Sequence, residues 1–215
     1  MESGKIEIRI FLLSLLAVLI IETASGITAL KTTFLSPLPF TGIVRFFQII
    51  LLILILSKFG KGISSIGLDP RHWSMGVIKG IIWSIAFGAC AALVFIALIA
   101  FRVNPLKIVG SGLPYQGKDL FFFFLIGGFI SPVTEEIFFR GIIYGFIRRW
   151  GAVIAVISTT VIFAVAHSGV SPFPFTQLIG GLLFAIAYEV EGNLMVPITI
   201  HVLGNMAIFV ILLMV

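Results

Sequence analysis

Apolar residues in this chain come in runs that are long enough to cross a lipid bilayer. A helix needs roughly 20 consecutive apolar residues to span a hydrocarbon core of about 30 Å. Of the 215 residues, 60% are hydrophobic and only 11% are charged. A soluble domain of this size has too much surface to hide that share of apolar side chains. The sequence therefore predicts an all-α fold, a polytopic membrane helix bundle.

The apolar runs divide the chain into about seven expected transmembrane helices. The fourth contains Pro132, which predicts a break or bend because proline lacks the amide hydrogen that a helix uses. A polar linker after the third run separates an N-terminal region, 1–118, with about three helices, from a second region, 119–215. The expected helices cover residues 8–30, 41–57, 75–100, 119–148, 151–167, 175–190 and 194–215.

Basic residues set the expected orientation, because cytoplasmic loops carry an excess of Lys and Arg. With the N-terminus inside, the inner segments hold most of these residues, so the C-terminus is expected outside. The net charge of +5 reflects this bias, and no nucleic-acid partner is expected. Small residues follow the first run at 24–26, so a cleaved signal peptide is the alternative to a retained span. Glu22, in the same run, is expected at a helix end near the interface, and a place lining a cavity is the alternative.

Three ionisable residues lie inside the fourth run, in the stretch TEEIFFRGIIYG (134–145). Charged groups are costly in hydrocarbon, and they mark functional sites or buried pairs there. Glu136 and Arg140 are four residues apart, so they share a helix face and can form a salt bridge. Glu135 is rotated about 100° from Glu136, which leaves it free to act. The alternative is an ion cluster of all three that only holds helices together.

Further polar groups lie in later runs. His167 ends the fifth run, and His201 and Asn205 are four residues apart in the seventh, on one helix face. Glu135 and His167 lie roughly 22 and 24 Å along their helices from the turn that joins the two runs. His201 can also lie deep in the bilayer. These side chains are therefore expected to converge on one cavity, although each alone is more typical of a hydrogen-bonded core residue.

The residue types favour hydrolysis of a carbonyl substrate. A Glu and a His can activate water as a general base, and a His and an Asn on one face can donate hydrogen bonds to an oxyanion. The motifs HExxH and GxSxG, which mark common hydrolases, are absent. A metal site is the alternative, since Glu135, His167 and His201 are acceptable zinc ligands.

In order and spacing, these motifs resemble those of the CAAX protease and bacteriocin-processing family of intramembrane proteases, also called the Abi family. The family pattern is EExxxR, FxxxH and HxxxN. Here it occurs as EEIFFR (135–140), FAVAH (163–167) and HVLGN (201–205). The resemblance covers about residues 119–215 and implies that this region is the catalytic core of a glutamate-dependent endopeptidase.

The resemblance also implies a role for each motif residue. Glu135 and His167 would activate the water, and His201 and Asn205 would form the oxyanion hole. The supporting residues would be Glu136 and Arg140. No cofactor is expected, although a zinc ion is possible and would have Glu135, His167 and His201 as ligands.

The expected partners are the bilayer and a protein or peptide substrate that is cut near its C-terminus. The site lies far from Arg148 and Arg149 of the inner turn, which places it nearer the outer face and argues against prenylated cytosolic tails. Prokaryotic sorting systems that use similar proteins imply a multi-pass protein of the prokaryotic cell membrane. Two rival functions also use buried ionisable groups: a proton-coupled transporter and a non-catalytic immunity or scaffold protein.

Overall fold

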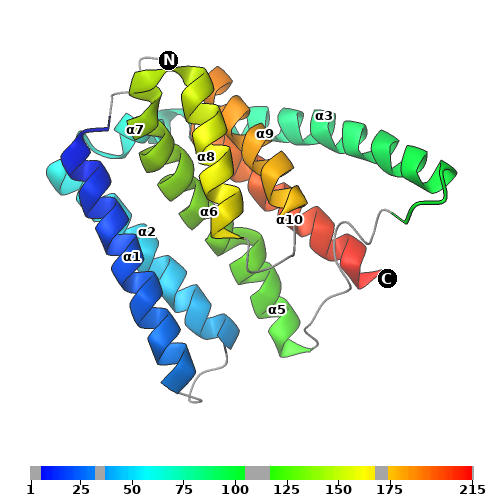
Figure 1. Cartoon of the computed structure of the whole chain (residues 1–215), viewed down its shortest axis with the longest axis horizontal. Coiled ribbons are helices and arrows are strands. Elements are labelled where there is room, and N and C mark those ends of the chain that lie inside the picture. Colours follow the sequence, from blue (N-terminus) through cyan, green and yellow to red (C-terminus); the bar gives the residue numbers. More distant parts are fainter. Residues whose placement is uncertain (1–5, 32–36, 105–116, 168–173, 215) are drawn as a thin grey trace.

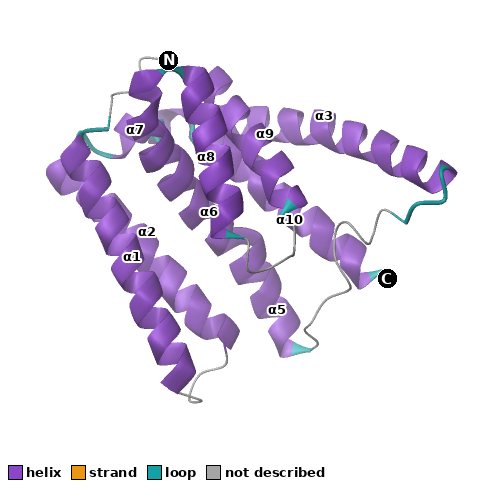
Figure 2. Cartoon of the chain, viewed as in Figure 1, coloured by secondary structure: helices purple, strands orange, loops and turns teal. Residues whose placement is uncertain are grey.

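The computed structural model describes residues 6–31, 37–104, 117–167 and 174–214, which are almost entirely helical (Figures 1 and 2). No strand occurs among these residues, which confirms the predicted all-α bundle. In chain order the elements are α1 (Ile8–Lys31), α2 (Pro37–Phe59), the 3-10 turns η1 (Ile63–Ile66) and η2 (Pro70–His72), α3 (Trp73–Ala100), α5 (Lys118–Leu125), the π-helix η3 (Ile126–Ile130), α6 (Ser131–Glu136), the π-helix η4 (Ile137–Tyr144), α7 (Gly145–Ile147), the 3-10 turn η5 (Arg148–Trp150), α8 (Ala152–Ala166), α9 (Phe175–Glu191) and α10 (Met195–Leu213).

All seven expected runs are helical, and their bounds lie close to those expected. Within the described residues, five helical stretches are long and apolar enough to cross a membrane. The other two runs are shorter: α8 has 15 residues and α9 has 17. At 1.5 Å per residue they are about 22 and 26 Å long. The five long stretches are Ile8–Ala29, Pro37–Phe59, Pro70–Ala100, Lys118–Trp150 and Met195–Leu213.

The fourth expected span is one helical path from Lys118 to Trp150, and it contains the two π-helical segments η3 and η4. Pro132 lies at the start of α6, between these segments. The predicted break is therefore a change of helical pitch, through which the helix continues. A π-helix shifts the backbone hydrogen bonds by one residue, and such segments often occur at functional sites. Here they flank α6, the six-residue helix that ends with the two adjacent glutamates.

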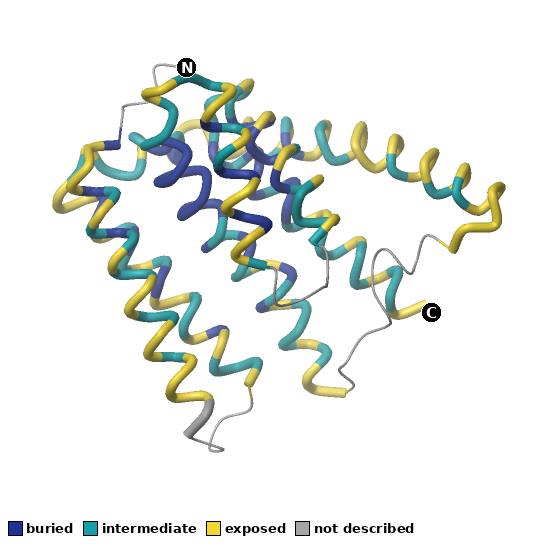
Figure 3. Tube along the Cα trace, viewed as in Figure 1, coloured by how far each residue is buried: buried dark blue, intermediate teal, exposed yellow. Residues whose placement is uncertain are grey.

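The buried core lies along α6 and η4, and other helices pack around it (Figure 3). All residues of η4 are buried. Both α1 and α2 contact this segment, and their residues Ile10 and Leu56 are 2% and 0% exposed. The side chain of Ile66 in η1 comes within 3.1 Å of where a Cβ on Gly141 would lie. The first motif is therefore at the centre of the molecule.

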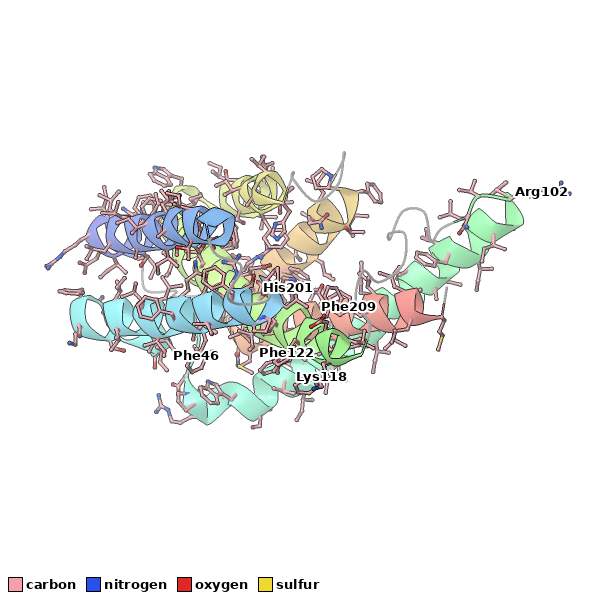
Figure 4. The ribbon with its side chains drawn as sticks, turned by 90° about the horizontal axis from the view of Figure 1, so that it is seen from below. Phe46, Arg102, Lys118, Phe122, His201 and Phe209 are labelled. Carbon is pink, nitrogen blue, oxygen red and sulfur yellow. The ribbon has the colours of Figure 1, made fainter. Side chains whose placement is uncertain are left out.

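Helix α3 packs along α10, and small residues allow the close approach. Gly76 and Gly80 are the buried residues of α3. A Cβ on Gly80 would lie 2.5 Å from Thr199 Cβ, and one on Gly76 would lie 2.6 Å from Met195 Cβ. The GxxxG spacing here is therefore a true packing contact. Beyond it α3 points away from the bundle, and Arg102 lies at its far end (Figures 1 and 4).

Two ion pairs fix the C-terminal end of α9. The guanidinium of Arg148 donates to both carboxylate oxygens of Glu189, at 2.8 Å from Nε and 2.7 Å from Nη2. Lys79 of α3 donates to Glu191 at 2.6 Å, and Trp83 of the same helix donates to it at 3.0 Å. These contacts hold α9 between the end of α7 and the start of α3.

Replacing Gly80 with leucine should push α3 away from α10, because the first carbon of the new side chain would already collide with Thr199. Overpacking of this kind costs about 1–3 kcal/mol. The midpoint of thermal unfolding of the purified protein in detergent should therefore fall, by about 2–4 °C for each kcal/mol. The matched control is Gly88→Leu on the same helix, since a Cβ there meets nothing within 4 Å. An equal fall in both variants would contradict the packing role of Gly80.

Candidate active site

The site is built on a buried ion pair within the first motif. Arg140 Nη1 donates to Glu136 Oε1 at 2.9 Å, and both side chains are 0% exposed. The salt bridge expected from the four-residue spacing is therefore present. Burial of a charge is strongly unfavourable unless the charge is paired and hydrogen-bonded. Each of these two residues consequently depends on the other for its place in the core.

A second interaction brings α10 to the same carboxylate. His201 Nδ1 lies 2.7 Å from Glu136 Oε1, and the His201 side chain is 7% exposed. Its ring stacks on Phe184 of α9, with the ring centroids 4.5 Å apart. Figure 4 shows His201 near the middle of the bundle. Glu136 therefore connects the third motif to the first.

Arg140 is held on its other side by α8 and α9. Its Nη2 donates to the carbonyl oxygen of Gly181 at 3.2 Å. The guanidinium carbon lies 4.5 Å and 5.1 Å from the ring centroids of Phe163 and Phe184, a cation–π arrangement that is strongest when desolvated. A Cβ on Gly181 would lie 3.3 Å from the Phe163 ring, so a larger residue would crowd this contact. Phe163, the first residue of the second motif, thus supports the arginine.

Glu135 faces two imidazoles. Its Oε2 is 3.7 Å from His167 Nε2 and 3.8 Å from His201 Nε2. The predicted convergence of these three side chains is therefore confirmed. The Glu135 side chain is 17% exposed, whereas that of Glu136 is fully buried. The two adjacent glutamates thus occupy different surroundings, as the rotation between successive helical residues requires.

The hydrogen bonds behind the two imidazoles determine which nitrogen faces Glu135. His167 Nδ1 is 2.8 Å from the carbonyl oxygen of Phe163, which can only accept a hydrogen bond. His201 Nδ1 faces the Glu136 carboxylate, which is also an acceptor. A neutral imidazole carries one N–H, so in both rings Nδ1 carries it and Nε2 presents its lone pair. Both Nε2 atoms, each with its lone pair, therefore lie within 3.8 Å of the same carboxylate oxygen of Glu135.

Asn205 makes a contact that bears on its expected role. Its Nδ2 donates to the carbonyl oxygen of Gly127 in η3, at 2.9 Å. The amide of Ser131 bonds back five residues to Ile126, so the next amide in this pattern, that of Pro132, would serve Gly127. Proline has no N–H, and Asn205 supplies the missing donor. Its second N–H has no acceptor among the described residues, and its role toward an oxyanion stays a prediction.

The atoms around Glu135 suit a water molecule, which can donate one hydrogen to the carboxylate and one to an imidazole. Zinc has bonds of about 2.0–2.2 Å to such ligands, which places them roughly 3.3 Å apart in a tetrahedral site. The separations of 3.7 and 3.8 Å are wider. Within the described ranges, no group of three or more His, Cys, Asp or Glu side chains is arranged as a metal site. The ligand types nevertheless fit zinc, because both imidazoles donate Nδ1–H to an acceptor, as zinc-binding histidines do.

A polar cluster on α1 and α2 lies outside the three motifs. Arg45 Nη1 donates to Glu22 Oε1 and, at 2.8 Å, to Gln48 Oε1. Thr134 Oγ1 lies 3.3 Å from the carbonyl oxygen of Arg45, so the cluster adjoins the residue before Glu135. The expected place of Glu22 at a helix end is wrong, because Glu22 lies within α1 and pairs with Arg45. The available signal was an arginine inside an apolar run, which requires a partner.

The comparison with known proteins agrees with the three motifs. Residues 117–207 match the family model described as Type II CAAX prenyl endopeptidase Rce1-like. This stretch includes all three motifs and is less than half of the chain. No curated protein and no solved structure matches the chain. The match confirms the resemblance to CAAX proteases and supports a CAAX-type intramembrane endopeptidase in general.

Replacing Arg140 with alanine should prevent stable folding, whereas replacing Glu135 with glutamine should not. Removing Arg140 leaves the Glu136 charge buried without its main partner, which typically costs about 3–5 kcal/mol. Glutamine at position 135 keeps the volume of a partly exposed side chain. Size-exclusion profiles and thermal unfolding of the detergent-extracted variants measure the difference. If the two variants lose their fold equally, the division between a supporting and an acting glutamate is incorrect.

Proposed function

We propose that the protein is a glutamate-dependent intramembrane endopeptidase that hydrolyses a peptide bond in a membrane-associated substrate. The observation that carries the proposal is the position of Glu135 Oε2, 3.7 Å and 3.8 Å from the Nε2 atoms of two histidines. A carboxylate and an imidazole so placed can hold and deprotonate one water molecule. The family match over residues 117–207 supports the same class of reaction.

In this mechanism Glu135 is the general base, and His167 orients the water. The water donates one hydrogen to Glu135 and the other to Nε2 of His167, so an oxygen lone pair is free to attack the peptide carbonyl. As the new C–O bond forms, one proton passes to Glu135. The same proton then goes to the amide nitrogen as the C–N bond breaks. The products are a new C-terminal acid and an amine, and water is the only co-reactant.

His201 and Asn205 stabilise the negative oxygen of the tetrahedral intermediate. Nδ1–H of His201 is bound to Glu136, so the oxyanion role of His201 requires a proton on Nε2, which the neutral ring lacks. Asn205 contributes the N–H that is not bound to Gly127. Loss of one oxyanion donor typically lowers kcat by about 10²–10³-fold.

The proposed substrate is the C-terminal segment of a protein that is anchored in, or associated with, the membrane. The depth of the site in the membrane does not determine from which membrane face the substrate enters. Glu135 is about 22 Å along the helix from Trp150, but His201 is only about 9 Å from the start of α10 at Met195. Prenylated tails are therefore candidates again, in agreement with the description of the matching family model. Two probes represent the two classes: a farnesylated-cysteine peptide with three further residues and a membrane-anchored reporter with an unmodified C-terminal tail.

Replacing Glu135 with glutamine should abolish cleavage of the probe that the wild-type protein cuts. Glutamine cannot take the proton of the attacking water, and general-base catalysis contributes about 10²–10⁴-fold in rate. The assay is mass spectrometry of both probes after incubation with the purified protein in liposomes. Glu7→Gln is the matched control, because Glu7 is exposed and precedes α1, and it should cleave normally. A wild-type protein that cuts neither probe, or a Glu135→Gln variant that cuts normally, would overturn the proposal.

Chelation separates the metal-free mechanism from a zinc-dependent one. In the metal-free mechanism, cleavage continues in the presence of chelator, and elemental analysis of the purified protein finds no stoichiometric metal. One zinc ion per chain, removed together with activity and restored together with it, would instead make Glu135, His167 and His201 metal ligands. That outcome would replace the metal-free mechanism with a zinc-dependent one, and the reaction would still be peptide-bond hydrolysis.

A further inference from the structure

We propose that Arg45 binds the free C-terminal carboxylate of the substrate, so that the enzyme selects peptide bonds near a chain end. The inference rests on the proposed function, because it assigns a specificity-determining residue to that site. Arg45 lies outside the three motifs and outside the matched residues 117–207. Three observations carry it: the place of Arg45 beside α6, the unused donors of its guanidinium, and the contacts that orient this group.

Arg45 lies on α2 at the point where this helix packs against the glutamate-bearing helix. Both η3 and α6 contact α2, and a Cβ on Gly42 would come within 2.8 Å of a side chain in η3. Thr134, directly before Glu135, donates to the carbonyl oxygen of Arg45 at 3.3 Å. Arg45 is therefore on the stretch of α2 that adjoins the residue before Glu135.

The guanidinium of Arg45 has donors that the protein does not use. Its hydrogen bonds to described residues all leave from Nη1. Its Nε is buried and has no partner in the described part of the chain, and Nη2 has no acceptor there either. Nε and Nη2 form one edge of the planar group, which can bind a carboxylate through two parallel hydrogen bonds. A buried N–H without an acceptor is unfavourable. The two oxygens of an incoming carboxylate would supply acceptors for Nε and Nη2.

Glu22 and Gln48 orient the guanidinium. Glu22 Oε1 accepts hydrogen bonds from Arg45 and from Gln48, the latter at 2.9 Å, and Gln48 Oε1 accepts from Arg45. Gln48 is 1% exposed, whereas the Arg45 side chain is 25% exposed. The glutamine therefore fixes the arginine from behind, while part of the arginine side chain, though not its Nε, is exposed. Ionisable residues within spans commonly line substrate pathways.

A chain end suits this position better than a carboxylate within a longer chain. Inside a bilayer, an extended peptide has no water for its backbone N–H and C=O groups, and each unsatisfied group is unfavourable. A substrate that ends shortly after the cut bond exposes the fewest such groups. Its terminal carboxylate then needs a cation at the same depth, and Arg45 is level with the residue before Glu135. An acidic side chain is the other possible source of the same chemical group.

Peptides that differ only in their C-terminal group test the assignment. The farnesylated probe is made with a terminal carboxylate, with a terminal carboxamide, and as a carboxamide whose last residue is Asp. The wild-type protein should show a kcat/KM for the carboxylate about 10–100-fold higher than for the carboxamide. Arg45→Gln should bring this ratio close to one by slowing only the carboxylate peptide. If the Asp-ended carboxamide is cut as fast as the carboxylate, the site recognises an acidic side chain, and the choice of a chain end is wrong.

A binding measurement separates failure of this inference from failure of the proposed function. Fluorescent forms of the carboxylate and carboxamide peptides are titrated against the protein in nanodiscs. If the carboxylate peptide binds more tightly and Arg45→Gln abolishes the difference, the Arg45 site is supported even when no peptide is cut, and only the proposed function is contradicted. If both peptides are cut without preference, the proposed peptidase function is supported and the assignment of Arg45 is overturned. Absence of both cleavage and preferential binding would overturn both.

Three variants distinguish recognition from a structural role. Arg45→Lys keeps the charge without the planar edge, so the protein should fold and lose most of the preference. Glu22→Gln keeps a side-chain oxygen that can accept from Arg45 and should keep the preference. Arg71→Gln is the matched control, because Arg71 is 82% exposed on a connector, and its ratio should equal the wild-type ratio. If Arg45→Lys folds and keeps the full preference, the planar edge of Arg45 does not bind the carboxylate, and the assignment is wrong.

Discussion

The carboxylate of Glu136 is the interaction on which the rest of the site depends. Its Oε1 accepts hydrogen bonds from Arg140 in η4 and from His201 in α10, and Arg140 in turn donates to Gly181 in α9. Helices from distant parts of the sequence therefore meet at one buried charge. Because an ionised group inside a bilayer is tolerated only with partners, a shift of any of these helices would leave a charge without its partner. Because a buried charge without its partner is unfavourable, the helices keep their positions relative to one another.

The geometry at Glu135 follows from this arrangement. Glu136 fixes one side of the His201 ring, so the other side is directed at Glu135. The carbonyl oxygen of Phe163 does the same for His167. Two groups that do not react thus determine where two reactive nitrogens point. The adjacent glutamates divide structure and chemistry because a helix turns by about 100° between them, which buries one and leaves the other accessible.

The parts of this structure that sequence could predict depend on local spacing. The pair four residues apart, Glu136 and Arg140, and the seven helical runs follow from helical and hydrophobic periodicity. The π-helical segments were missed because a change of helical pitch leaves the apolar pattern almost unchanged. The link between Glu22 and Arg45 was missed for another reason: a sequence shows each intramembrane charge but not its distant partner. The contact of His201 with Glu136 joins residues 65 positions apart and could not be predicted for the same reason.

Asn205 shows how helix geometry and chemistry are coupled in this site. Pro132 and the π-helix before it leave the carbonyl oxygen of Gly127 without a backbone donor, and Asn205 fills that place. The side chain is thus needed for the local structure whatever it does in catalysis. Loss of activity on replacing it would therefore not by itself establish an oxyanion role. Only its second N–H can serve an oxyanion, so that role must be judged from kcat in a variant that keeps the bond to Gly127.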